Sequence, residues 1–441
     1  MTRRDTVRKL RMNRGKLLRI TVGIALAMSM LFGGALPAYA ANDPITGTEQ
    51  DPAAAAITKT LKMGEGVSTP EVTFSFAFTP VSVDGATSGA DYNNMPPVSL
   101  KTVAFDPDTD TGTTASGIKT VSKETESLFG AITWPHAGVY IYDVVETQSL
   151  ASGTLSVQEK ILYSSAKYRI SVFVANGTSG LFVAAIGAEV AIIDTPDGAE
   201  AGDKVDGRLG GDPEVSGDFS RIIFTNTYQK TTGTGDPLEY VLAISKTVTM
   251  DNTIDYDFAN RERYFDFEVT VTKSNANANA TQTYKAYVLD TNGVNVTSAF
   301  NYTGTLEEDS TYGDYIEFTT ASQATVHLKH GQYLSFVDLE VGATYSVTEL
   351  AAPDFTPSCE QTIDDVATNI PGTVNTNLSI PGTGITEGDD RADFTNVYKT
   401  VTPTGIGIDE LPFFVLAGLA LTGLVVFAAL RYRRRRTEND A

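Results

Sequence analysis

The stretch Arg-Ile-Ile-Phe-Thr-Asn-Thr-Tyr at residues 221–228 recurs as Arg-Ala-Asp-Phe-Thr-Asn-Val-Tyr at residues 391–398. In both copies, apolar or aromatic residues alternate with polar ones, which is the period of a β-strand with one buried face. The alternation puts an asparagine, Asn226 or Asn396, on the same side of its strand as the neighbouring phenylalanine. Each copy is therefore predicted to be a strand that buries an amide among apolar side chains.

Three further blocks recur upstream of these strands, in the same order. Residues 57–63 (ITKTLKM) match 244–250 (ISKTVTM), residues 72–76 (VTFSF) resemble 264–267 (YFDF), and residues 138–146 (GVYIYDVVE) parallel 342–349 (GATYSVTE). An ordered internal repeat indicates homologous domains. We predict one domain over residues 53–230 and a second over residues 239–400, joined by a polar linker at 231–238.

The repeated blocks are short, β-branched or aromatic, and separated by turn residues, so the predicted fold class is all-β. Tandem immunoglobulin-like β-sandwiches fit this pattern, and no long helix is expected within either domain. Residues 41–52 are expected to be a flexible lead-in. Two Asp/Gly/Thr/Ser-rich insertions in the first domain, at 82–128 and 194–218, are expected to be surface loops.

Period-two alternation also turns charged side chains inward. Lys59 shares a face with Ile57 and Leu61, and Glu146 shares a face with Tyr142 and Val144. The second domain repeats the pattern. The polar residues expected inside are Lys59, Glu146 and Asn226 in the first domain, and Lys246, Glu349 and Asn396 in the second.

A buried lysine and a buried glutamate shift toward their neutral forms, because burial disfavours charge. A neutral amine is a nucleophile, and a protonated carboxyl can polarise a neighbouring carbonyl and move a proton. Each set is therefore suited to attack by lysine on the asparagine carboxamide with loss of ammonia, giving an intramolecular isopeptide bond. The alternatives are a buried hydrogen-bonded network, or strand ends where these residues reach water. The duplication of all three residue types favours the bond.

The two ends of the chain indicate export. Residues 1–40 combine a basic start, an apolar stretch from Ile20 and a small-residue close at Ala38-Tyr39-Ala40, which is typical of a secretory signal peptide; a retained anchor is the alternative. Residues 411–430 form an uncharged run long enough to span a bilayer. The basic tail at 431–441 is expected to stay in the cytoplasm.

Composition excludes several classes of protein. The formal net charge of −21 argues against nucleic-acid binding. One cysteine, Cys359, permits no internal disulfide and is expected to be a free thiol in a loop, and three histidines are too few and scattered for a metal site. The acidic run at 106–112 departs from a calcium loop in its glycine and twelfth positions, so we predict no metal and no cofactor.

The motifs TKTL, YDVVE and FTNTY of the first domain, and SKTV, YSVTE and FTNVY of the second, resemble those of Gram-positive pilins. The resemblance is to the streptococcal backbone-pilin type, which is built from Cna B-like immunoglobulin folds. It implies cross-links Lys59–Asn226 and Lys246–Asn396, with Glu146 and Glu349 as the catalytic residues of a single-turnover self-modification. It covers nearly the whole exported chain and implies a structural protein that is not an enzyme.

The end of the second domain resembles a sortase sorting signal. Pro403, Thr404 and Gly405 lie within the segment 401–405, followed by the apolar span and the basic tail. The resemblance implies that a sortase attacks the Thr404 carbonyl, releases Gly405 onward, and passes the chain to peptidoglycan or to a lysine of another pilin subunit. The proline directly before the threonine departs from the commoner LPxTG pattern. An uncleaved membrane anchor is the alternative.

The predicted function is a sortase-assembled pilin subunit at the cell surface, with the membrane as a partner only before processing and any host ligand unidentified. A monomeric wall-anchored adhesin or stalk is the alternative, and a surface enzyme is a third class without a recognisable turnover site. Polymerisation needs an acceptor lysine. The position implied by the resemblance, within 216–221, holds none, so Lys204 in an expected Asp/Gly-rich exposed loop is the nearest candidate.

Overall fold

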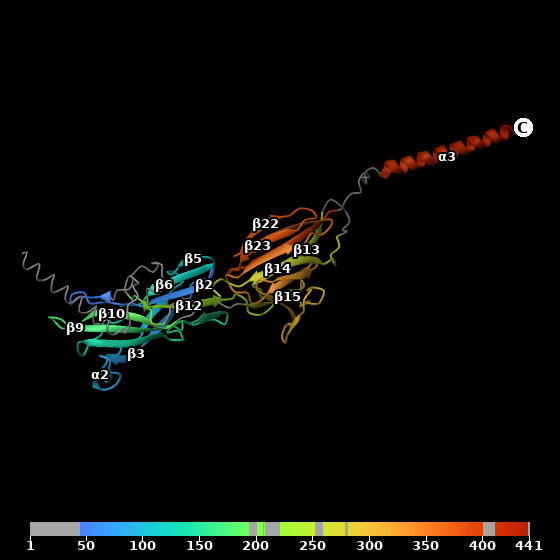
Figure 1. The fold of residues 1–441 in the computed structure, drawn as a ribbon. Helices are drawn as coiled ribbons and strands as arrows, with labels where there is room; N and C mark the ends of the chain where they lie inside the picture. Colours follow the sequence, from blue (N-terminus) through green and yellow to red (C-terminus); the bar gives the residue numbers. More distant parts are fainter. Residues whose placement is uncertain are drawn as a thin grey trace, which may run out of the picture.

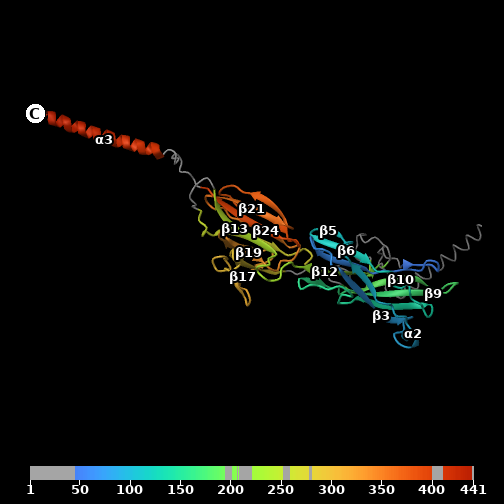
Figure 2. The same cartoon turned by 180° about the vertical axis from the view of Figure 1, so that it is seen from behind.

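The computed structural model describes residues 45–193, 201–205, 207, 221–251, 259–277, 281–399 and 411–439. Two β-sheet units follow one another along the chain, and a single long helix, α3, comes after them (Figure 1). The same succession is seen from behind in Figure 2. The all-β prediction is confirmed, since the only other described helix is the four-residue α2 at Ala90–Asn93.

One sheet of the first unit runs in the order β1-β10-β9-β7-β3-β4, with β11 paired to β10. Its strands are β1 (Ile45–Thr46), β3 (Val72–Val83), β4 (Lys101–Phe105), β7 (Gly138–Glu146), β9 (Lys167–Asn176), β10 (Leu181–Ile192) and β11 (Lys204–Val205). The second sheet runs β5-β6-β2-β12-β8. Its strands are β2 (Thr58–Gly64), β5 (Thr113–Ala115), β6 (Ile118–Glu124), β8 (Glu159–Leu162) and β12 (Ile223–Lys230).

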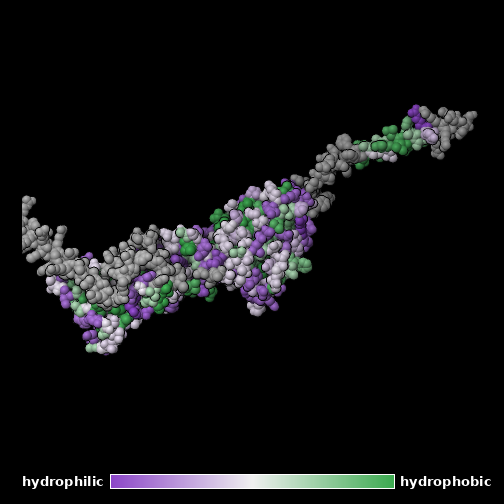
Figure 3. All heavy atoms as spheres, viewed as in Figure 1, coloured by the Kyte–Doolittle hydropathy of each residue, from purple (hydrophilic) through white to green (hydrophobic). Residues whose placement is uncertain are grey.

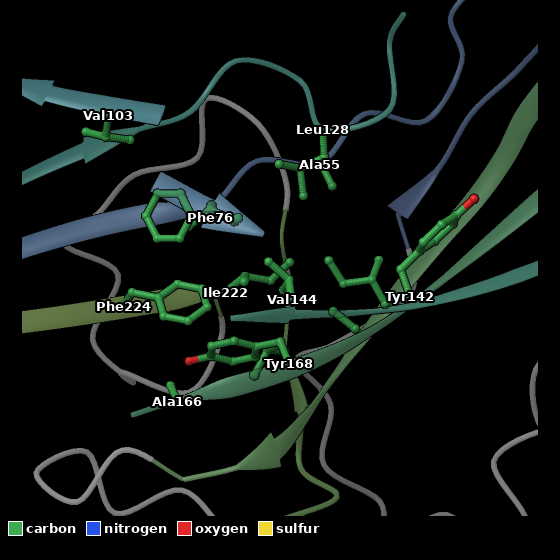
Figure 4. Packing of buried hydrophobic residues seen from close by; sticks show 14 of the residues in the cluster. Ala55, Phe76, Val103, Leu128, Tyr142, Val144, Ala166, Tyr168, Ile222 and Phe224 are labelled. Carbon is green, nitrogen blue, oxygen red and sulfur yellow. The ribbon is translucent and has the colours of Figure 1, made fainter. Parts of the chain in front are cut away.

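The core of the first unit lies between these sheets (Figure 4). Phe76 and Val144 come from the first sheet and Phe224 from the second, and all three are fully buried. The rings of Phe76 and Phe224 lie 5.0 Å apart. Because the strands alternate, this packing requires Asn226 and Glu146, two residues beyond Phe224 and Val144, to face the same core.

The second unit repeats the two-sheet plan. One sheet runs β16-β17-β15-β19-β13-β24-β21-β22 and the other β18-β14-β20-β23. The strands of the first are β13 (Leu242–Met250), β15 (Thr283–Leu289), β16 (Glu307–Asp309), β17 (Gly313–Thr319), β19 (Gln332–Phe336), β21 (Phe355–Ile363), β22 (Val366–Pro371) and β24 (Asp390–Tyr398). Those of the second are β14 (Phe265–Thr272), β18 (Gln323–Leu328), β20 (Thr344–Glu349) and β23 (Leu378–Gly384).

In each unit the lysine-bearing strand pairs in parallel with the asparagine-bearing strand at the other end of the domain sequence. Lys59 pairs with Phe224 across β2 and β12, and Lys246 pairs with Phe394 across β13 and β24. The asparagine therefore stands two residues beyond the lysine's partner in both units. This common register places one lysine and one asparagine on adjacent strands of the same buried face.

A tight joint connects the two units. Val341, in the segment between β19 and β20, is 2% exposed and belongs to the core cluster of the first unit. Its amide donates to the Lys230 carbonyl at 2.8 Å. Gly342 has φ of +85°, and a Cβ there would lie 2.8 Å from the Gly64 Cα, so glycine is required for this approach. Residues 231–238, expected to be a simple linker, begin with a bridge from Thr231 to Glu340.

Two expectations about connecting segments need correction. The lead-in was expected to be flexible, but β1 pairs with β10, Ile45 is 8% exposed, and Glu49 accepts the Thr178 amide at 2.9 Å. The insertion at 82–128 was expected to be a surface loop, but it supplies β4, β5 and β6. Strand β6 pairs with β2 along its length, although Val121 is its only buried residue. Hydrogen bonds to the central strand β2 therefore stabilise β6, although its own sequence shows no strong alternation of apolar and polar residues.

Cys359 was expected in a loop, and this is wrong. It lies within β21, opposite Phe394 of β24, and is fully buried. Burial raises the pKa of its thiol to about 12, so the thiol is free and protonated at neutral pH.

Helix α3 (Leu411–Asn439) contains the predicted span and continues into the basic tail. By length and composition, its segment Val415–Tyr432 could cross a membrane, and the space-filling view shows apolar residues along it (Figure 3). The predicted signal peptide at 1–40 lies outside the described residues.

Candidate functional site

The three polar residues predicted inside the first domain meet in its core. Lys59 on β2 is 0% exposed, Glu146 at the end of β7 is 3% exposed, and Asn226 on β12 is 0% exposed. Lys59 Nζ lies 2.8 Å from Glu146 Oε1, and Asn226 Nδ2 donates to the same oxygen at 2.9 Å. One carboxyl oxygen thus contacts both nitrogens.

The second domain reproduces this arrangement. Lys246 on β13, Glu349 at the end of β20 and Asn396 on β24 are each 1% exposed. Lys246 Nζ donates to Glu349 Oε1 at 2.7 Å, and Asn396 Nδ2 donates to that oxygen at 2.6 Å. The inward positions predicted from alternation are therefore confirmed in both domains.

Each ammonium lies over an aromatic ring. Lys59 Nζ is 4.6 Å from the ring centroid of Phe74, and Lys246 Nζ is 4.4 Å from that of Phe265. Strands β3 and β14 supply these rings and also pair with the strand that ends in the glutamate. Phe76 stands opposite Glu146, and Phe267 stands opposite Glu349. Strands β3 and β14 therefore present aromatic side chains to both trios.

This apolar burial changes the proton affinities. Desolvation raises the pKa of Glu146 above its ordinary value despite the opposing charge of Lys59. Desolvation likewise raises the pKa of Glu349 and lowers the pKa of Lys246 to about 8, against the attraction between the two groups. Both shifts favour the neutral pair of an amine and a carboxylic acid. The arrangement can thus supply a nucleophilic amine next to an amide and an acid.

The second carboxyl oxygen is buried in both domains and has no hydrogen-bond partner among the described residues. This holds for Oε2 of Glu146 and of Glu349. A buried carboxylate with one unsatisfied oxygen is costly, so protonation is further favoured.

The amide oxygens of the two asparagines differ in their partners. The Ser164 amide donates to Asn226 Oδ1 at 2.7 Å. Asn396 Oδ1 is buried and has no hydrogen-bond partner within the described part of the chain. Ser164 was not singled out from the sequence, because its contact is made by the backbone and leaves no pattern in residue type.

Of the other predicted site residues, only Lys204 is described, and it is not part of these clusters. Pro403, Thr404 and Gly405 lie outside the described residues. Lys204 was expected in an exposed loop, but it is partly buried in β11, where it pairs with Glu189 of β10. The loop expectation was wrong because β10 offers this short segment backbone partners.

Comparison with known families agrees with the first domain. Residues 55–229 match the family model described as a Spy0128-like isopeptide containing domain. Residues 240–398 match a model described as a domain of unknown function (DUF7601). The predicted recognition of an isopeptide domain is thus confirmed over the first domain. No curated protein matches the chain.

Several solved pilus proteins are similar to this chain at low identity. The major pilin from Streptococcus pyogenes is 19% identical, with 78% of this chain and 99% of that chain covered and a TM-score of 0.30. The T-13 major pilin from the same species is 18% identical, with 81% and 99% covered and a TM-score of 0.28. The pilus-presented adhesin Spy0125 (Cpa) is 11% identical, with 78% and 99% covered and a TM-score of 0.23.

Proposed function

We propose that this chain is a structural pilin subunit of a Gram-positive cell surface, and that each domain is closed by a self-formed isopeptide bond. The proposal is carried by one observation, made twice: a single buried carboxyl oxygen contacts both the lysine nitrogen and the asparagine amide nitrogen. The matched isopeptide family over residues 55–229 supports the same chemistry.

The shared oxygen suits a proton shuttle. As Lys59 Nζ attacks Asn226 Cγ, Glu146 accepts a proton from Nζ and delivers one to Nδ2. The Cγ–Nδ2 bond then breaks, ammonia leaves, and the Nζ–Cγ amide remains. Lys246, Glu349 and Asn396 carry out the same steps in the second domain. Each glutamate acts once on its own chain, so the protein turns over no substrate and is not an enzyme.

The bonds would strengthen the domains against tension. Each joins the strand near the start of a domain to the strand at its end, and these strands are parallel neighbours. Force entering along one strand passes through the cross-link to the other without unravelling the intervening chain. As covalent loop closures, each bond is worth about 5 kcal/mol in the chain-entropy model. Unlike disulfides, they resist reduction.

Surface attachment would use the sorting segment and α3. The apolar segment Val415–Tyr432 holds the precursor in the membrane. A sortase then cuts after Thr404 within the Pro403-Thr404-Gly405 motif and transfers the chain to peptidoglycan or to another subunit. Lys204 is retained as the candidate acceptor, and its partial burial in β11 means that the edge beside β10 must admit the sortase.

Intact mass tests the isopeptide bonds. Purified residues 41–400 should weigh less than their sequence by two molecules of ammonia. A mass equal to the unmodified sequence contradicts the proposal. Peptide mapping should then identify linked Lys59–Asn226 and Lys246–Asn396 peptides.

Immunoblots of cell-wall extracts test assembly. Wild-type cells should give a ladder of boiling-resistant species that is lost in Thr404→Ala. A single monomer band in the wild type favours a monomeric wall-anchored adhesin instead. A ladder that persists in Lys204→Ala keeps the pilin function and moves the acceptor to another lysine.

A further inference from the structure

The amide oxygen of Asn226 is held by a backbone donor, whereas the amide oxygen of Asn396 has no such donor among the described residues. The Ser164 amide lies 2.7 Å from Asn226 Oδ1, and both groups are buried. When an amine attacks an amide carbon, negative charge develops on this oxygen. A fixed N–H at this distance, in apolar surroundings, is positioned to stabilise that charge.

The difference arises from the neighbouring strand in each domain. Strand β8 pairs with β12 only up to Leu162, opposite Thr227, and the chain then turns so that Ser164 reaches the Asn226 side chain. In the second domain, β21 continues past the asparagine and places Pro357 opposite Asn396. The backbone of β21 therefore stays paired with β24 at the level of Asn396, where the first-domain chain has already turned away from β12.

The Ser164 segment is itself held in place. Gln148 Nε2 donates to the Ser164 carbonyl at 2.8 Å, and the Ala166 amide donates to Ser164 Oγ at 3.2 Å. Gln148 follows Glu146 by two residues just beyond β7. The segment that carries Glu146 therefore also holds Ser164 in place, through the side chain of Gln148.

We propose that the Ser164 backbone N–H is an oxyanion donor for isopeptide formation in the first domain, and that Gln148 is its positioning residue. The inference rests on the proposed self-modification. In the step, Nζ of Lys59 forms a bond to Asn226 Cγ, and the carbonyl electron pair moves to Oδ1, where the Ser164 N–H donates a hydrogen bond to the negative charge. Glu146 takes a proton from Nζ and delivers one to Nδ2, the pair returns as the Cγ–Nδ2 bond breaks, and ammonia leaves, so no co-reactant is consumed.

A backbone amide-to-ester substitution at residue 164 tests the donor directly. The full chain is made by cell-free translation with lipid nanodiscs, and the α-hydroxy analogue of serine is inserted at position 164 so that oxygen replaces the N–H. Samples are quenched in denaturant at intervals and digested. Mass spectrometry then measures the linked Lys59–Asn226 peptide, with the Lys246–Asn396 peptide of the same molecules as an internal clock.

Loss of one oxyanion donor should slow the first-domain bond about a hundredfold and leave the second-domain bond unchanged. An unchanged ratio of the two rates overturns the inference. Absence of both linked peptides in the wild type overturns the proposed function instead, so the two failures are distinguishable.

Gln148→Met is the companion variant, because it keeps the length of the side chain and removes its donor. It should slow the first-domain bond by about tenfold, less than the ester, since the N–H remains. Protease resistance of the unlinked first domain identifies slow chemistry in a folded domain. If the ester chain does not fold, Gln148→Met decides: a rate equal to wild type, relative to the internal clock, overturns the inference.

Discussion

The two domains hold lysine, glutamate and asparagine in the same register but surround the asparagine oxygen differently. In the first domain Asn226 Oδ1 accepts the Ser164 amide, whereas Asn396 Oδ1 in the second has no partner among the described residues. The contacts of the shared glutamate oxygen are nearly identical, between 2.6 and 2.9 Å. The repeat thus preserves the nucleophile, proton carrier and leaving group, while the surroundings of the oxygen diverge.

This comparison separates two requirements of the chemistry. The parallel pairing of the lysine and asparagine strands is common to both domains, so it sets which groups can meet. The strand on the other side of the asparagine is free to end early, as β8 does, or to continue, as β21 does. In the proposed self-modification, the strand pairing would decide whether a bond can form, and the neighbouring strand would change its rate.

Removing the glutamate has the largest expected effect. Glu349→Ala should stop the second-domain bond, because its carboxyl oxygen contacts both the lysine and the asparagine nitrogen, and Glu146→Ala should stop the first for the same reason. Each variant should lose one ammonia instead of two by intact mass, and the affected domain should lose about 5 kcal/mol of unfolding free energy. Each variant is the other's control. Loss of both ammonia molecules in Glu349→Ala would show that the glutamate has been given the wrong role.

The next largest effect tests whether the stability of the first domain depends on its contact with the second. Val341→Ala removes a second-unit side chain from the first unit's core and should destabilise the first unit by about 2 kcal/mol. Calorimetry should show a lower first-domain transition, with both isopeptide bonds intact. Val366→Ala, at a position 67% exposed on β22, is the matched control and should change little. If the first domain unfolds at the same temperature in both variants, the contact through Val341 does not stabilise the first domain.

The pH dependence should sharpen the comparison in the second domain. The reactive pair, Lys246 as a neutral amine and Glu349 as a carboxylic acid, carries one proton. At low pH a second proton binds and converts the amine to an ammonium, which cannot attack. At high pH the one proton is lost, and Glu349 can no longer protonate the departing ammonia. With the pKa of Lys246 near 8, the rate of bond formation should fall about tenfold per pH unit above that value. The protein would be purified in its unfolded, unlinked form and refolded by dilution into buffers of different pH. The rate at which the Lys246–Asn396 link forms would then be measured in each buffer. A rate that keeps rising well above pH 8 would contradict the shuttle.

The smallest effect is expected at the polar edge of the joint. Glu387 accepts the Ser68 amide at 2.9 Å and lies 3.0 Å from Lys230 Nζ. Glu387→Gln removes the charge and should weaken coupling between the domains by up to about 1 kcal/mol, because the pair is partly solvated. Calorimetry at low and high salt would measure it, with the exposed Glu360→Gln as control. A salt-independent loss would point to the Ser68 hydrogen bonds instead.

Alternation in the sequence was sufficient to predict the trios. Strands with one buried face have a fixed period, so Lys59, Lys246 and their partners could be turned inward from residue order alone. The internal repeat made the prediction stronger, since both copies gave the same three residue types. The apolar run within α3 could likewise be identified from length and composition.

Features that depend on distant backbone partners were missed. Strand β6 and the segment around Lys204 carry weak patterns and become strands because β2 and β10 offer them hydrogen bonds. Cys359 was placed in a loop for the same reason, although β21 pairs with β24 along its length.

The sequence by itself therefore determined which side chains are buried together, because burial follows a local period. Only the tertiary structure decided what surrounds them: the Ser164 amide at one asparagine, Pro357 at the other, and Val341 in a neighbouring domain's core. These contacts are made between segments far apart in the chain, and the Ser164 contact is made by a backbone N–H, which is chemically the same at almost every residue and leaves no mark in residue type.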